Sequence, residues 1–382
     1  CIRDRDGWTH TRCGQSRRPR TLSDQGGFLE CRAIGGSVAI TNNRGIAVPC
    51  CITDTSSTTE WDTHSIYNLK TLDDVHESYH WFQMEDQMQD GIWPKECTQC
   101  KMLEHNKRHH AKDGQPQSTR GRINRQLTRD KILQRLHISL DYHCNLSCRS
   151  CRPGISSRWD RMDVSGLHQF DADHYKDLGE GDYSDNMMRL LENTDLSHLT
   201  RVRLSGGEPF LAKNIDRFME MIPTEQIDFS VNTNGTVVYP LPKFKSVNIE
   251  LSIDATGDLF ESMRYPAKWD KVSRNMKQWE KQGPVSINCT LSVMNVNHIQ
   301  RVIDLGYETK VYPIFWPAYL RHTQIPWAHR EKWLTTDEHI NNTIMFPYEK
   351  QTGALEAMKE MDRLMDHKFP NKEICQILEE MK

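Results

Sequence analysis

A repeating order of strand, loop and helix between residues 131 and 318 constrains the fold of this chain more than any other feature. Six short runs have the apolar character of β-strands, and helical periodicity separates them. Such alternation implies parallel strands joined by right-handed crossovers. We therefore expect an α/β fold, a partial (β/α)6 TIM-like barrel whose chemistry lies at the carboxyl ends of the strands. The expected strands cover residues 136–140, 202–204, 227–231, 247–253, 285–293 and 310–315, and the expected helices include 214–221, 269–281 and 298–305.

The first expected strand ends in a loop that is rich in cysteine. Cys144, Cys148 and Cys151 stand at C-x3-C-x2-C spacing. Three cysteines this close cannot easily pair as disulfides, and a tetrahedral zinc site would need a fourth ligand that the loop does not obviously provide. A cubane 4Fe-4S cluster that leaves one iron open to a small chelating ligand fits the loop better. A structural zinc knuckle or a set of reduced thiols is the alternative interpretation.

The second expected strand ends in the turn Ser205-Gly206-Gly207-Glu208. Glycines at a strand end let the backbone approach a ligand closely, and a glutamate there can accept hydrogen bonds from an ammonium group. A Gly-Gly-Glu turn alone is weak evidence. After the three-cysteine loop, however, it resembles the GGE motif of the radical SAM superfamily. The resemblance implies that S-adenosylmethionine (SAM) binds the open iron and that this turn contacts its methionine amine.

Further residues at the strand ends are candidates for the same cofactor. The resemblance places Ser252 and Asp254 near the ribose and carboxylate of SAM, although an ordinary turn with Asp254 as a helix cap is the alternative. Asn232 has the same ambiguity. Arg264 follows the fourth strand, where related enzymes place a basic residue near the active site; the alternative is a surface arginine. The expected cofactor-binding residues are Ser205, Gly206, Gly207, Glu208, Asn232, Ser252, Asp254 and Arg264.

A second group of cysteines precedes the expected barrel. An alternating run, the turn Asn42-Asn43-Arg44-Gly45 and a second apolar run predict a hairpin with Cys31 and Cys50 near its outer ends, followed by a helix over residues 72–88. Cys97 and Cys100 then form a C-x2-C turn. Spacing alone leaves zinc and a second iron-sulfur cluster open.

The order of these elements resembles the SPASM and twitch auxiliary-cluster domains that accompany radical SAM cores, although here it precedes the barrel instead of following it. The resemblance implies a second iron-sulfur cluster on Cys31, Cys50, Cys97 and Cys100, with Cys51 as a competitor for the place of Cys50.

The sequence predicts that the chain has five parts. Residues 1–26 are a disordered or misassigned start, 27–104 an auxiliary-cluster domain, 105–130 a basic linker, 131–318 the partial barrel and 319–382 a helical extension with helices over 353–368 and 371–382. A stripe of methionines in the first of these helices is expected to be core.

Composition limits the classes of partner. Lys plus Arg total 49 against 52 for Asp plus Glu, so no overall field attracts nucleic acid or an anionic membrane, and neither is an expected partner. The chain shows no long apolar run and no signal-peptide pattern, so we expect a soluble, cytoplasmic protein. Its 12 cysteines then point to metal rather than to disulfides.

The resemblance implies an enzyme that reductively cleaves SAM to a 5'-deoxyadenosyl radical, which abstracts hydrogen from a substrate in a net oxidative modification. Its expected partners are a peptide or protein substrate and an external reductant such as flavodoxin or ferredoxin. Two alternatives come from other classes: a zinc-stabilised module that binds RNA or protein, and an iron-sulfur electron-transfer protein that does not cleave SAM.

Overall fold

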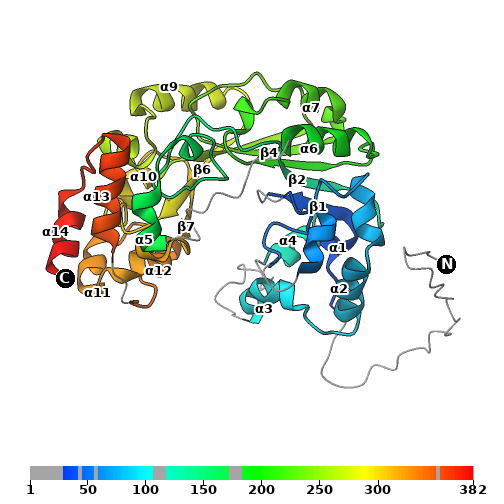
Figure 1. Cartoon of the computed structure of the whole chain (residues 1–382), viewed down its shortest axis with the longest axis horizontal. Coiled ribbons are helices and arrows are strands. Elements are labelled where there is room, and N and C mark those ends of the chain that lie inside the picture. The colour runs from blue at the N-terminus through cyan, green and yellow to red at the C-terminus, as the bar shows by residue number, and fades with distance from the viewer. Residues whose placement is uncertain are drawn as a thin grey trace, which may run out of the picture.

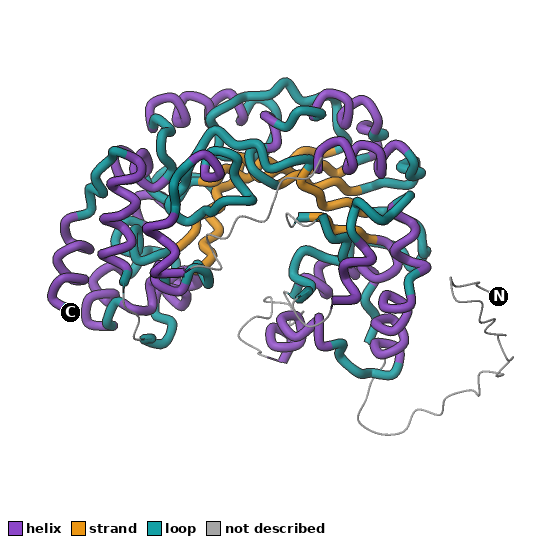
Figure 2. Tube along the Cα trace, viewed as in Figure 1, coloured by secondary structure: helices purple, strands orange, loops and turns teal. Residues whose placement is uncertain are grey.

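One parallel sheet organises the molecule. The computed structural model describes residues 29–41, 45–55, 59–105, 118–171, 183–349 and 353–381. Its seven strands pair in chain order, each parallel to the next. The sheet curves into an arch that is open on its lower side in Figures 1 and 2. The strands are β1 Ser37–Ile40, β2 Arg135–Ser139, β3 Arg201–Ser205, β4 Asp228–Thr233, β5 Ser246–Ser252, β6 Val285–Leu291 and β7 Glu308–Pro313.

The six strands expected from the sequence are all present as β2 to β7, so the partial TIM-like barrel is confirmed. The two faces of the sheet differ in chemistry. In β3, Val202 and Leu204 are buried, whereas Arg203 and Ser205 on the other face are half-buried. Because side chains alternate along a strand, the apolar residues face the helices and the polar residues face the open side of the arch.

Helices cover the apolar face. α6, α7 and α9 lie along the outer side of the arch in Figure 1, and α6 buries Met187, Met188, Leu190 and Leu191. The helices of this part are α5 His168–Asp171, α6 Tyr183–Glu192, α7 Ile215–Met221, α8 Gly257–Met263, α9 Trp269–Trp279 and α10 Ile299–Ile303. Residues 172–182, between α5 and α6, lie outside the described residues.

The C-terminal helices expected from the sequence are confirmed. α13 spans Ala354–Met365 and α14 spans Lys372–Glu380, after the short helices α11 Trp327–Arg330 and α12 Glu338–Ile344. Met358, Met361 and Met365 of α13 are buried, so the methionine stripe belongs to the core as expected. Among the described residues, no helix combines the length and the apolar composition that a membrane span requires.

The expected hairpin is only partly present. Its first arm is β1, which pairs in parallel with β2 as a seventh strand of the sheet. Its second arm returns beside β1 with one antiparallel bridge, in which Ala39 and Val48 exchange backbone hydrogen bonds of 2.7 and 2.9 Å. Pro49 follows at once and has no N–H to continue a ladder. The turn residues 42–44 lie outside the described residues.

Short helices complete the segment before β2. They are α1 Arg32–Gly36, α2 Tyr79–Gln89, α3 Thr98–His105 and α4 Thr119–Asn124. The helix expected over residues 72–88 is divided, because Leu72–Glu77 forms a 3₁₀ turn and α2 begins only after Ser78, whose hydroxyl accepts a hydrogen bond from the backbone N–H of Trp81.

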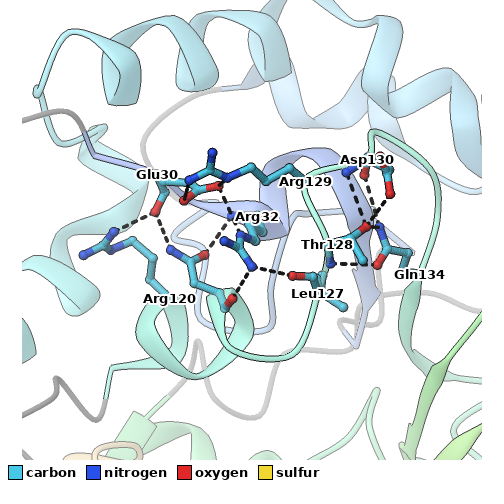
Figure 3. Close-up of polar contacts among 9 residues, drawn as sticks. Glu30, Arg32, Arg120, Leu127, Thr128, Arg129, Asp130 and Gln134 are labelled. Atoms are coloured by element: carbon cyan, nitrogen blue, oxygen red, sulfur yellow. Dashed lines mark hydrogen bonds and ion pairs between the residues drawn. The ribbon is translucent and has the colours of Figure 1, made fainter.

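The described part of the expected linker is ordered around α4. Ser118 caps this helix by accepting a hydrogen bond from the N–H of Gly121. Arg32 donates to the backbone carbonyls of Asn124 and Leu127 at 2.7 Å each, so α1 and α4 are fastened together (Figure 3). Residues 106–117 lie outside the described part, and the division of the chain into five parts stays a prediction.

Candidate functional site

A cavity of about 380 Å³ opens at the carboxyl ends of the strands. Six neighbouring strands each contribute at least one polar side chain at or just beyond their last residues. These residues include Thr41, Ser139, Ser205, Asn232, Ser252 and Thr290. The volume lies in the range of small-molecule sites. Nine of the residues expected to hold the cofactor or the core metal line this cavity: Cys144, Cys148, Cys151, Ser205, Gly206, Gly207, Asn232, Ser252 and Arg264.

The core cysteines face this cavity with hydrogen-bond donors around them. The backbone N–H of Leu146 lies 3.4 Å from Sγ of Cys144, and Nδ2 of Asn234 lies 3.9 Å from the same sulfur. Nη1 of Arg264 lies 3.9 Å from Sγ of Cys148. Burial raises the pKa of all three thiols, that of Cys151 to about 12. N–H donors and a guanidinium are suited to the negative charge that these sulfurs would carry as ligands of iron.

Backbone hydrogen bonds with the segment that follows β5 hold the cysteine loop in place. The N–H of Ser147 donates to the carbonyl of Tyr265 at 2.7 Å, and the N–H of Arg149 donates to that of Met263 at 2.9 Å. The side chain of Arg149 is fully buried and binds the carbonyl of Met358 and the carboxylate of Asp362. Sequence reasoning missed Arg149, although an arginine between two cysteines of the C-x3-C-x2-C loop was a signal.

The two glycines of the Gly-Gly-Glu turn are required by the cysteine loop itself. Gly206 has φ of 122°, and a Cβ there would lie 2.8 Å from the carbonyl oxygen of Asp141. A Cβ on Gly207 would lie 2.6 Å from the carbonyl oxygen of Tyr142. The turn therefore packs backbone against backbone, and this fixes the position of the cysteines relative to β3.

Glu208 lies behind the cavity wall and is not among its lining residues. Its carboxylate accepts hydrogen bonds from Oγ1 of Thr233 and from the N–H of Asn234, both at 2.7 Å. Burial raises the pKa of Glu208 to about 7. Glu208 thereby holds the end of β4 and directs Asn234 towards Cys144. Its expected contact with an amine stays a prediction.

Asp254 also lies outside the lining, and it orients Arg264. Its Oδ2 pairs with Nη2 of Arg264 at 2.8 Å, while Oδ1 accepts from the N–H of Thr290 at 2.7 Å. Both side chains are almost fully buried. Asp254 and the nearby thiols raise the pKa of Arg264. The alternative of a surface arginine is therefore wrong, and so is that of Asp254 as an ordinary helix cap.

The N-terminal cysteines gather at a second, narrow cavity. Cys31, Cys50, Cys97 and Cys100 all line it, whereas Cys51 is exposed and is not among its lining residues. Burial raises the pKa of these thiols, that of Cys31 to about 12 and that of Cys100 to about 11.

Arg120 brings a positive charge to this second cavity. It lines the cavity and also pairs with Glu104 and with the carbonyl of Glu30 (Figure 3). In the part of the chain that the structure describes, no group of three or more His, Cys, Asp or Glu side chains could hold a metal ion as it stands. A cubane cluster does not require the cysteines to converge on a single ion, because each of them binds a different iron.

Comparisons with known proteins find curated relatives that match part of the chain. No family model matches the chain. GTP 3',8-cyclase of Desulforamulus reducens is 27% identical over 192 residues, which are 47% of this chain and 52% of that relative. GTP 3',8-cyclase of Aliarcobacter butzleri is 24% identical over 163 residues, 40% of this chain and 45% of that relative. The chain thus spans about half the length of the curated relatives that it matches.

Solved structures overlap with the chain only weakly. Native anSMEcpe with bound AdoMet has a TM-score of 0.35 at 17% identity and covers 62% of this chain and 63% of its own. Streptococcus suis SuiB bound to S-adenosylmethionine has a TM-score of 0.32 at 17% identity, with coverage of 48% and 41%.

The sequence relatives and the site support the same family. The core loop presents three thiols to a cavity at the strand ends, and the Gly-Gly-Glu turn packs against that loop. A 4Fe-4S cluster and SAM fit this donor set. Together with the similarity to the cyclases, these features support a radical SAM superfamily enzyme.

Proposed function

We propose that this chain is a radical SAM enzyme that abstracts hydrogen from a peptide or protein substrate in a net oxidative modification. The observation that carries the proposal is the cavity in which the three core cysteines, the strand-end hydroxyls and Arg264 meet. When bound at the core loop, a reduced 4Fe-4S cluster supplies the electron that cleaves SAM to methionine and a 5'-deoxyadenosyl radical.

The residues of this chain hold and shield that chemistry. Asn232 and Ser252 contribute an amide and a hydroxyl to the wall, and their side chains lie 3.2 Å apart, ready to bind the polar groups of SAM. Arg264 places a positive charge next to Cys148 and compensates part of the charge of a thiolate-bound cluster. The backbone of Gly206 and Gly207 forms part of the same wall.

The four N-terminal cysteines are proposed to hold a second iron-sulfur cluster. Their common cavity and the neighbouring guanidinium of Arg120 support this assignment. The second cluster accepts the electron that a net oxidation leaves behind, and an external reductant such as flavodoxin or ferredoxin serves the first.

Exposed aromatic side chains favour a peptide or protein as the substrate. Tyr312 is 56% exposed and stands opposite Thr290, a cavity residue, in the register of β6 and β7. Phe315 and Trp316, which follow the same strand, are 62% and 52% exposed. Aromatic side chains at the mouth of a site are typical anchors for a polypeptide.

A nucleotide substrate is the second candidate. Two of the relatives, each named GTP 3',8-cyclase, match 40% and 47% of this chain. Their match leaves about half of each relative uncovered, so the name alone does not decide the substrate.

The first test is spectroscopic. The protein is reconstituted with iron and sulfide without oxygen, reduced with dithionite and mixed with SAM. We expect SAM to change the electron paramagnetic resonance spectrum of one cluster, and 5'-deoxyadenosine to form. A spectrum that SAM leaves unchanged, with no 5'-deoxyadenosine, would contradict the proposal and favour electron transfer. Bound zinc in place of iron would favour the binding module.

A further inference from the structure

The polar face of the sheet continues below the cavity as a second layer of side chains. His137 stands two residues before the cavity residue Ser139 in β2, and Arg203 stands two residues before Ser205 in β3. Residues two apart share a face of a strand, so both point to the open side of the arch. They are direct neighbours in the register of β2 and β3. Asn288 and Lys310 occupy the corresponding pair in β6 and β7.

This layer has more positive than negative charge. Arg203 and Lys310 share one acid, Glu250, which pairs with the first and lies 3.4 Å from Nζ of the second. Nζ of Lys310 also lies 3.7 Å from Glu308, an exposed carboxylate. Arg135, two residues before His137 on β2, is buried, and it donates to the hydroxyl of Ser37 rather than to an acid. Burial lowers the pKa of His137. The positive charges of Arg203, Arg135 and Arg122 of α4 lower it further.

Polar atoms of the same face are buried without a hydrogen-bond partner among the described residues. The ring of His137 is bonded through Nε2 to Ser205, yet its Nδ1 has no partner, and only 6% of the residue is exposed. Oδ1 of Asn288 and Nε of Arg201 are likewise unpaired. Buried polar groups are normally satisfied, so unpaired atoms gathered on one face indicate a place for a ligand.

We propose that the face formed by Arg203, Lys310 and His137 is a subsite for an anionic group of the substrate, a carboxylate or a phosphate. This inference rests on the proposed function, because it assigns part of the same substrate. The side chain of Arg203 is 27% exposed, so an anion can reach it from the open side of the arch. Glu250 holds both cations in place and competes with the anion for them.

The position of the subsite suits a substrate that spans the molecule. Its upper neighbours, Ser139 and Ser205, belong to the core cavity. On the other side, Arg135 lies close enough to Cys50 and Cys51 to be influenced by their charge. An anion held here therefore lies between the core loop and the N-terminal cysteines.

The test is a binding measurement on the reconstituted, unreduced protein by titration calorimetry, with inorganic phosphate and glutarate as separate probes. We expect at least one probe to bind. Phosphate alone indicates a nucleotide-like substrate, and glutarate alone or both indicate an acidic group of a peptide. Because no SAM is cleaved in this experiment, its failure overturns the subsite and leaves the radical chemistry to its own test.

Variants separate an anion subsite from a merely structural ion pair. The double variant Arg203→Gln/Glu250→Gln removes both charges of the pair without leaving either one alone, and we expect it to weaken binding about tenfold or more. Glu250→Gln alone removes the competing acid and is expected to tighten binding by about threefold to tenfold. Lys243→Gln changes an exposed lysine that pairs with Glu225 and is expected to have no effect.

Two results would overturn the inference. One is that neither probe binds the wild-type protein. The other is that the double variant, shown to be folded by circular dichroism, binds the probes as tightly as wild type does.

Discussion

Arg264 is the buried charge on which the core site depends most. It pairs with Asp254, and both side chains are inaccessible to solvent apart from a few per cent. Removing one partner of a buried pair leaves the other charge uncompensated. We expect Arg264→Gln to lower the free energy of unfolding by about 3–5 kcal/mol in urea titrations, and to reduce the iron retained after reconstitution. Arg264→Gln/Asp254→Asn should recover part of the stability, whereas Arg274→Gln on the exposed side of α9 should be neutral. Equal losses from Arg264→Gln and Arg274→Gln would contradict this account.

Glu208 supports the end of β4 from a buried position. Its two oxygens satisfy Thr233 and Asn234, so Glu208→Ala leaves a hydroxyl and an N–H buried without partners. We expect a loss of about 2–4 kcal/mol in the free energy of unfolding and a weaker binding of SAM. Glu225→Ala removes an exposed carboxylate as the matched control and should change stability by less than about 0.5 kcal/mol. A Glu208→Ala protein as stable as this control would refute the positioning role.

The turn after β3 has no room for a side chain at its two glycines. Gly207→Ala would push a methyl group into the backbone of the cysteine loop. We expect this variant to keep its N-terminal iron but to lose core iron and 5'-deoxyadenosine formation, as measured by iron analysis and chromatography. The control is Gly306→Ala, because Gly306 has open space around the position of its Cβ. Its positive φ of 82° adds a backbone strain that Gly207→Ala does not have, so the comparison isolates the steric contact with the loop. If both variants retained the core cluster equally, close packing of the turn would not be what holds the loop.

The start of α8 is pH-sensitive because a histidine caps it. Nε2 of His298 accepts from Oγ1 of Thr256 at 3.0 Å and lies 3.4 Å from its N–H, and burial lowers the pKa of His298 to about 4 from 6.5. A depressed pKa means that the neutral form stabilises the fold above pH 6.5, and that this contribution is lost as the pH falls towards 4.

The matching variant is His298→Leu, which cannot accept these hydrogen bonds. At pH 7.5 we expect wild type to be more stable than this variant by about 1 kcal/mol in urea titrations. The difference should shrink steadily between pH 6.5 and 4. A difference that is constant across this range would exclude His298 as the titrating cap.

At the scale of the whole molecule, the sequence predicted the elements with a strong period and missed those that depend on distant partners. Strands β2 to β7 and helices α13 and α14 follow from alternating or helical apolar patterns. The sequence of β1 is equally consistent with one arm of a hairpin. It becomes a strand of the main sheet only because it pairs with β2, which follows nearly a hundred residues later in the chain. Local pattern carries no information on such a partner.

The candidate site likewise has one part that the sequence predicted and another that it missed. Cysteine spacing and strand ends placed the core cysteines and most cofactor residues at one cavity. The support roles of Glu208 and Asp254, and the buried Arg149, depend on which backbone groups lie nearby in the folded chain. Whether the assigned residues bind SAM stays a prediction.

The most direct test of the central claim compares two sets of cysteine variants in one anaerobic assay. One set replaces Cys144, Cys148 and Cys151 by Ala, and the other replaces Cys31, Cys50, Cys97 and Cys100 by Ala. After reconstitution and reduction with dithionite, iron and 5'-deoxyadenosine are measured for each protein. We predict that the first variant keeps roughly half of the iron and makes no 5'-deoxyadenosine, while the second also loses iron but still cleaves SAM. Formation of 5'-deoxyadenosine by the first variant at the wild-type rate would contradict the assignment of the radical site to the core loop.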